Sequence, residues 1–132
     1  MTYALDTNIV IHLLRGTSSV RAKRDEAIAQ GAEIIIPQFV NYEILRGFLC
    51  EPAPAKEKIY KSLCLNYSIG EMTAEIFEHG AKIYADLWKK RLTVGDADIL
   101  IAAFCMIGNY ILVTDNKKHF EVIDNLKFSN WV

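Results

Sequence analysis

The stretch that decides the fold is residues 2–16, TYALDTNIVIHLLRG, in which a short apolar run stops at Asp6 and a helical pattern follows. Residues 3–5 are all apolar, which predicts a buried strand. Residues 8–15 then carry apolar side chains at helical spacing until Gly16. The stretch therefore predicts a strand, a turn that carries a carboxylate, and a helix.

The same alternation of apolar strands and helices continues along the chain. Short apolar or β-branched runs predict further strands at residues 34–36, 67–69, 110–113 and 127–129. Apolar residues at helical spacing predict helices at residues 18–30, 39–49, 73–91 and 97–107, with another beginning after Pro54. Nearly all-apolar strands that alternate with helices are typical of a parallel sheet covered on both faces. We expect a single domain, residues 1–132, because single cores commonly serve domains of about 100–150 residues.

The composition favours a folded cytoplasmic protein without a global attraction to nucleic acid. Hydrophobic residues make up 52% of the chain, and 15 basic residues face 16 acidic ones. RNA binding would therefore need a local basic patch. The chain shows no secretion signal and no apolar run long enough for a membrane span. The cysteines lack metal-like spacing and are expected to be buried free thiols: Cys50, Cys64 and Cys105.

Several carboxylates fall where a parallel sheet gathers ligands. Asp6 and Asp115 follow predicted strands directly, and Asp96 and Asp98 open a predicted helix. In open α/β sheets, ligands bind beyond the carboxyl ends of the strands. Clustered carboxylates raise one another's pKa unless a cation compensates them, and Mg²⁺ prefers oxygen ligands and retains waters that can attack a phosphodiester. The pattern therefore favours a divalent-metal site that acts on a phosphate.

Each acid also has an ordinary structural role. Asp6 and Asp96 can cap helices, and Asp98 can complement a helix dipole. Glu43 can pair with an arginine one turn later, and Asp115 fits turn chemistry. Only the joint pattern favours catalysis.

Four segments stand out in a fixed order: LDTN at 5–8, YEILRG at 42–47, GDADILIAA at 95–103 and LVTDN at 112–116, followed by Phe120 and a closing Asn130-Trp131. Together they resemble the PIN-domain family, and within it the VapC-type toxins of bacterial toxin–antitoxin pairs. The resemblance covers nearly the whole chain. It implies a three-layer α/β/α sandwich with a mainly parallel sheet of about five strands. It also implies an endoribonuclease that uses Mg²⁺ or Mn²⁺.

The resemblance assigns the acids of the site. Three of them match the family's first three acids and would bind the metal and carry catalysis: Asp6, Glu43 and Asp98. The family's variable fourth acid falls at Asn116, one place after Asp115, and which of the two completes the pocket stays open. Asp96 would be an auxiliary ligand. The residues expected to orient the carboxylates or the water by hydrogen bonds are Thr7, Asn8 and Thr114.

The resemblance also implies an RNA substrate, a homodimer and a small VapB-like antitoxin. An arginine of the antitoxin would enter the acidic pocket, and its helix would dock on Ile11, Leu14 and Val20. No ligand role is expected for the histidines, and no partner is expected for His79 or His119. The candidates for a phosphate-binding patch are Arg15, Arg46, Lys89, Lys90, Arg91, Lys117 and Lys118, with a solvated helix end as the alternative for residues 89–91.

Two rival functions remain at this point. A haloacid-dehalogenase-like phosphatase also has an Asp after its first strand, but its second acid, two residues later, is here Asn8. A catalytically inactive module would keep the fold and bind RNA or protein in the same groove. The three matching acids argue against an inactive module.

Overall fold

A five-stranded sheet forms the centre of the computed structural model, which describes residues 1–132. The strand order is β3-β2-β1-β4-β5, and every neighbouring pair is parallel. This confirms the predicted sheet. The strands are β1 (Thr2–Leu5), β2 (Glu33–Pro37), β3 (Ser68–Gly70), β4 (Ile111–Val113) and β5 (Phe128–Ser129).

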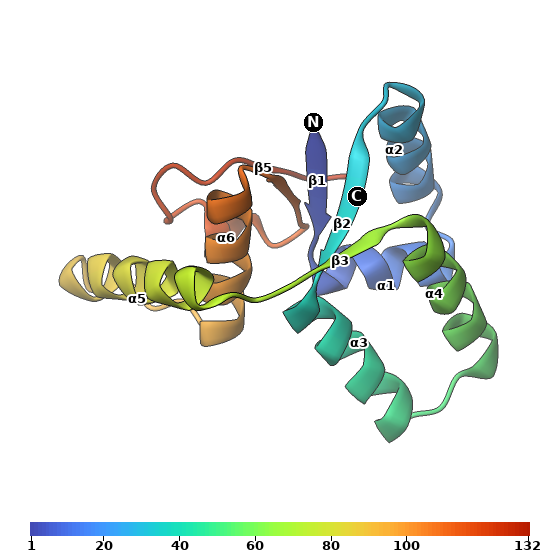
Figure 1. The fold of residues 1–132 in the computed structure, drawn as a ribbon, viewed down its shortest axis with the longest axis horizontal. Coiled ribbons are helices and arrows are strands. Elements are labelled where there is room, and N and C mark those ends of the chain that lie inside the picture. The colour runs from blue at the N-terminus through green and yellow to red at the C-terminus, as the bar shows by residue number, and fades with distance from the viewer.

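Helices cover both faces of the sheet, as the alternating pattern predicts. Figure 1 shows α5 and α6 on one side of the strands and α1, α2 and α4 on the other. The helices are α1 (Thr7–Arg15), α2 (Ser18–Ala29), α3 (Gln38–Cys50), α4 (Pro54–Asn66), α5 (Ala74–Lys89), α6 (Asp96–Gly108) and α7 (Lys117–Phe120). None of them is both long and apolar enough to cross a membrane. The short helix α7 is the one element that the sequence analysis did not predict.

The core explains why the central elements are almost wholly apolar. Leu5 on β1, Leu112 on β4 and Ile9 on α1 are completely buried, and α6 buries all five residues from 101 to 105. Full burial of one such aliphatic side chain contributes about 1.5–3 kcal/mol. Helix α6 is apolar on most of its surface, because α5 also covers it. Gly80 of α5 allows the two helices to approach closely, since a Cβ at this position would lie 3.1 Å from Leu100 of α6.

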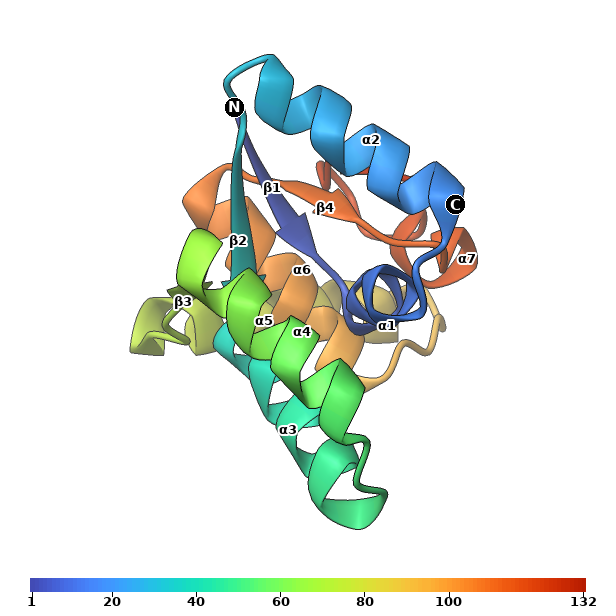
Figure 2. The ribbon, with the colours of Figure 1, turned by 90° about the vertical axis from the view of Figure 1, so that its right-hand side faces the viewer.

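The three cysteines are free, as expected, but only Cys105 is buried. Cys64 is half-buried. Cys50 is exposed because it lies at the end of α3, which extends beyond the sheet (Figure 2).

The strand order places a topological switch point between β1 and β4. The chain passes from β1 to β2 and β3 on one side, and β4 and β5 lie on the other. Crevices at such points, outside the carboxyl ends of the strands, are where open α/β sheets bind ligands. Figures 1 and 2 show α1 and α3 beginning at this edge. A backbone hydrogen bond of 2.9 Å from Asp6 to Val113 joins the ends of β1 and β4 there.

Candidate active site

Asp6 lies in the crevice and has only uncharged partners. Its side chain is buried and accepts hydrogen bonds from the backbone N of Thr7 at 2.8 Å, Nδ2 of Asn8 at 3.1 Å and Oγ1 of Thr114 at 2.8 Å. Burial raises the pKa of Asp6, the bonds from its three partners oppose that rise, and the negative charge of Asp98 adds to it. Asp6 is also the N-cap of α1, which is the structural role that the sequence offers as the alternative.

Thr114 and Asn8 tie the ends of β1 and β4 together around this carboxylate. Thr114 is buried, and its Oγ1 also accepts a hydrogen bond of 3.0 Å from the backbone N of Asn116. Oδ1 of Asn8 accepts one of 3.3 Å from the backbone N of Asp115. Both side chains thus fix the orientation of the Asp6 carboxylate.

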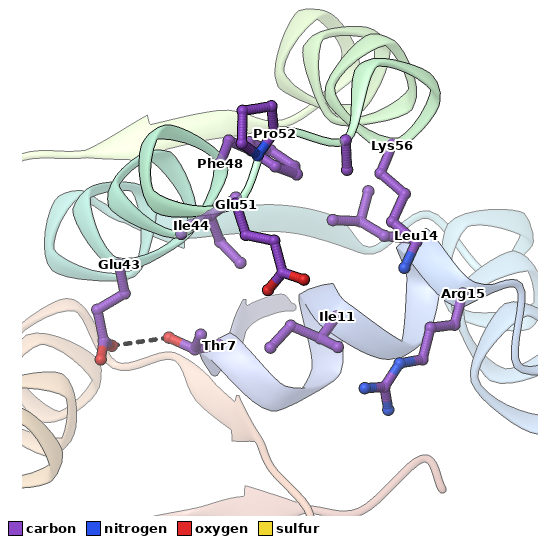
Figure 3. A pocket seen from close by; sticks show the side chains of 12 residues that line it. Thr7, Ile11, Leu14, Arg15, Glu43, Ile44, Phe48, Glu51, Pro52 and Lys56 are labelled. Atoms are coloured by element: carbon purple, nitrogen blue, oxygen red, sulfur yellow. Dashed lines mark hydrogen bonds between the residues drawn. The ribbon is translucent and has the colours of Figure 1, made fainter.

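Glu43 reaches the site from α3 through Thr7. Oγ1 of Thr7 donates a hydrogen bond of 2.8 Å to Oε1 of Glu43, which Figure 3 shows as a dashed line. Arg46 lies one turn further along α3, and its Nη2 is 3.5 Å from Oε2 of Glu43. Because the Arg46 side chain is 54% exposed, this long ion pair is weak and leaves Glu43 available.

Asp98 lies in the first turn of α6 and pairs with His119 of α7. Nδ1 of His119 is 2.7 Å from Oδ2 of Asp98, so the expectation that His119 has no partner is wrong. No local pattern reveals this contact, since its two residues are 21 positions apart and α7 was not predicted. Asp96 is exposed and does not cap α6, because Gly95 takes the N-cap position.

Asp115 and Asn116 point in different directions. Oδ2 of Asp115 lies 3.4 Å from Nε2 of His12, whose Nδ1 contacts Thr17, on the α1 side of the site. Nδ2 of Asn116 lies 3.0 Å from Nδ1 of His119 and therefore stands beside the partner of Asp98. The sequence alone left these two residues undecided.

The donor set fits a hydrated divalent cation. As the side chains stand, no three His, Cys, Asp or Glu groups converge on a point that could hold a metal ion. Mg²⁺, however, usually keeps several waters and binds through one or two carboxylates. Asp6 is buried without a cationic partner and within the influence of the Asp98 charge, which is the imbalance that such an ion would relieve.

A hollow of about 330 Å³ opens beside Glu43 between α1, α3 and the start of α4. Figure 3 shows Glu43 at one side of it and Arg15 and Lys56 at the other. Lys56 was not predicted from the sequence, because only the packing of α4 brings it to this side. Ile11 and Leu14 also line the hollow, but Val20 lies on the core side of α2, is completely buried and offers no docking surface.

The other basic candidates divide by position. Lys117 and Lys118 are exposed on α7, next to His119. Lys90 instead forms ion pairs with two carboxylates, Asp86 at 3.0 Å and Asp124 at 2.8 Å. Its positive charge is therefore already neutralised within the protein. Lys89 and Arg91 lie at the far end of α5, which runs away from the sheet in Figure 1.

Comparison with known proteins gives consistent matches over the whole chain. Residues 3–126 match the family model described as PIN domain. A curated relative, Ribonuclease VapC2 of Rickettsia felis, is 30% identical over 99% of this chain and 98% of its own length. Ribonuclease VapC1 of Haemophilus influenzae is 26% identical over 99% of this chain and 98% of its own length.

Two solved structures show the same fold at full length. The crystal structure of VapBC2 from Rickettsia felis, bound to a DNA fragment from the promoter, superposes with a TM-score of 0.92 at 26% identity and covers 100% of both chains. The structure of VapBC-1 from nontypeable Haemophilus influenzae gives a TM-score of 0.87 at 24% identity, covering 99% of this chain and 98% of that one.

Proposed function

The chain belongs to the PIN-domain family, and from that membership we propose that it is the endoribonuclease toxin of a toxin–antitoxin pair, cutting RNA with the help of Mg²⁺ or Mn²⁺. One observation carries the metal dependence. The buried carboxylate of Asp6 has only uncharged partners, although the charge of Asp98 acts on it.

Asp6 and Asp98 would hold the ion, with Glu43 joining directly or through a water. Asn116 completes the pocket better than Asp115, since Asn116 stands beside the partner of Asp98 and Asp115 faces His12. When bound, the ion would neutralise charge on the phosphate and make a water molecule bound to it more acidic.

The chain's own residues prepare the site before RNA arrives. Thr114 and Asn8 hold Oδ2 of Asp6 in one orientation, and the backbone N of Thr7 holds Oδ1. The Thr7 hydroxyl holds Glu43 towards the same crevice. Such preorganisation removes reorganisation from the chemical step.

The hollow beside Glu43 supplies cations for the RNA backbone. Arg15 and Lys56 line it, and neither forms an ion pair in this structure. Lys117, Lys118 and the exposed Arg46 add charge around the crevice. Because the net charge is −1, this local group has to supply the attraction to phosphate.

Two protein partners complete the proposal. A small VapB-like antitoxin is supported by the solved VapBC2 structure from Rickettsia felis and by the apolar wall that Ile11, Leu14 and Phe48 give the hollow. A second copy of the chain would cover exposed aromatic side chains of α5, Tyr84 and Trp88. Light scattering on the purified chain and on a Trp88→Glu variant tests the dimer.

RNA cleavage by the purified chain tests the function directly. We expect cleavage with Mg²⁺ or Mn²⁺, none in excess chelator, and none from Asp98→Asn at any metal concentration. RNA binding without cleavage by the wild type would instead support the inactive module. Full cleavage by Asp98→Asn would refute the site.

A further inference from the structure

His119 occupies an unusual place between two polar side chains. Its Nδ1 lies 2.7 Å from Oδ2 of Asp98 and 3.0 Å from Nδ2 of Asn116. Asp98 is largely covered, with 21% of its side chain exposed. Its one side-chain hydrogen-bond partner is His119. Neither the sequence analysis nor the comparisons assign a role to this histidine.

One nitrogen cannot serve both neighbours at once. A carboxylate accepts hydrogen bonds and the amide nitrogen of Asn116 donates them, whereas Nδ1 of a neutral imidazole does one or the other. The shorter contact, 2.7 Å, is to the carboxylate, so Nδ1–H is the donor and Oδ2 of Asp98 accepts the hydrogen bond. The Asn116 amide is then not engaged by the ring and can turn its carbonyl oxygen towards the site.

The backbone that carries His119 is fixed at both ends of α7. Phe120 is completely buried in the core. At the other end, the backbone N of Asn116 donates to Oγ1 of Thr114, which itself donates to Asp6, and the backbone N of His119 donates to the carbonyl of Asn116 at 3.1 Å. Residues 114–119 therefore supply one partner to Asp6 and another to Asp98.

We propose that His119 is a positioning residue that holds Oδ2 of Asp98 through Nδ1–H and so leaves Oδ1 of Asp98 for the divalent cation. The proposal rests on the metal-dependent function proposed above. Groups that hold a metal-binding side chain in this way commonly change metal affinity about 10–100-fold when they are removed. His119 thus acts on the metal through Asp98 and is not itself a metal ligand.

Calorimetric titration with MnCl₂, without RNA, tests the proposal on four proteins. His119→Ala should bind Mn²⁺ about 10–100-fold more weakly than the wild type. His119→Asn places an amide N–H close to the position of Nδ1 and should keep most of the affinity, whereas His119→Gln places its amide further out and should not. His79→Ala, a histidine on α5 whose Nε2 has no partner, is the matched control and should bind as the wild type does.

Two further measurements separate positioning from a general loss of structure. The side chain of His119 is 53% exposed, so His119→Ala should melt close to the wild type without metal. Its cleavage should recover at saturating Mn²⁺. The ¹⁵N spectrum of the wild-type protein should show a proton on Nδ1 of His119.

Failure of the proposed function and failure of the His119 role give different results. If the wild type binds no Mn²⁺, the proposed function falls and this inference with it. If the wild type binds Mn²⁺ and His119→Ala binds it equally well or more tightly, the positioning role alone is wrong. A bare Nδ1 in the wild-type spectrum overturns the role independently of any metal.

Discussion

The Thr7 hydroxyl donates a hydrogen bond of 2.8 Å to Oε1 of Glu43, although 36 residues separate the two. The backbone N of the same threonine donates to Oδ1 of Asp6 at 2.8 Å. One residue therefore connects two of the three acids, and its two donors play separable roles. The backbone donor belongs to the helix cap, and the hydroxyl belongs to the site.

Thr7→Val should separate these roles, because valine keeps the shape and the backbone N–H but lacks the hydroxyl. We expect kcat/KM for RNA cleavage to fall about 10–100-fold, the size found when a partner of a metal ligand is removed. Thermal melting should change little. Thr7→Ser, which keeps a hydroxyl, is the control and should retain most activity. A Thr7→Val enzyme with full activity would show that Glu43 does not need the hydrogen bond from the Thr7 hydroxyl.

Asp6→Asn should stabilise the metal-free protein at neutral pH. The pKa of Asp6 is raised in the folded state, so ionisation of this side chain above its folded pKa costs stability that the neutral asparagine does not lose. Asparagine also remains a good N-cap for α1. The advantage over the wild type should shrink as the pH falls through the raised pKa, and it should be nearly gone below the unfolded value of 3.8.

Melting curves of both proteins in chelator, recorded from neutral to acidic pH, measure this difference. Asp115→Asn is a suitable control, since Asp115 is exposed and its carboxylate faces His12. An Asp6→Asn protein that melts below the wild type at neutral pH would mean that the lost hydrogen bonds outweigh the relief of buried charge.

The sequence predicted most of the fold because the fold depends on local patterns. Apolar runs such as residues 111–113 and the helical pattern after Asp6 identify the strands and helices without tertiary information. Asp6 was found for the same reason, since it directly follows a strand. Its burial and its place at the switch point then follow from the strand order.

What the sequence did not predict depends on contacts between distant residues. Helix α7 has four residues, too few for a periodic pattern, and with it the pairing of His119 with Asp98 escaped notice. Val20 appeared to be a docking residue because an apolar side chain suits a docking surface as well as the core, and only the packing of α2 shows that it is buried. Lys90 appeared free because Asp124, one of its partners, is 34 residues away.

Divalent metal should raise the melting temperature, because a ligand that binds only the folded state stabilises it by mass action. At a metal concentration of 100 times Kd the gain is about 2.7 kcal/mol. Asp98→Asn should lose the shift. Asn116→Ala should reduce it and Asp115→Asn should not, because Asn116 lies beside the partner of Asp98 and Asp115 does not. The reverse order for these two variants would assign the fourth position to Asp115.

Arg15→Ala and Lys56→Ala should weaken RNA binding in a salt-dependent way. Each cation that neutralises a phosphate contributes about 0.7 to the slope of log K against log salt for a single strand. We expect each variant to lower the slope by about that amount and to raise KM with little change in kcat. Lys90→Ala is the matched control: it removes a cation already paired with Asp86 and Asp124, and it should leave the slope unchanged. Equal effects of all three variants would indicate a general effect of charge and no specific contact.

The last prediction concerns the cognate antitoxin. Its binding to the toxin and its inhibition of RNA cleavage should depend on different contacts. A guanidinium matches carboxylates with two parallel donors, so an arginine of the antitoxin can occupy the crevice of Asp6 and Asp98 in place of the cation. Replacing that arginine with alanine should restore cleavage while the complex largely persists, because apolar contacts in the hollow still hold the partner.

Ile11→Asp on the toxin should instead weaken the complex itself. Ile11 lines the hollow and is 37% exposed, so it is available to an apolar helix. Burial of an isoleucine is worth up to about 1.5–3 kcal/mol, which corresponds to a Kd weakened about 10–100-fold. Ile28→Asp, on α2 and outside the hollow, is the control and should bind as the wild type does. If the complex with the antitoxin arginine variant dissociates as readily as the Ile11→Asp complex, the acidic crevice itself anchors the antitoxin. If that complex persists and RNA is still not cleaved, the antitoxin inhibits at a place other than Asp6 and Asp98.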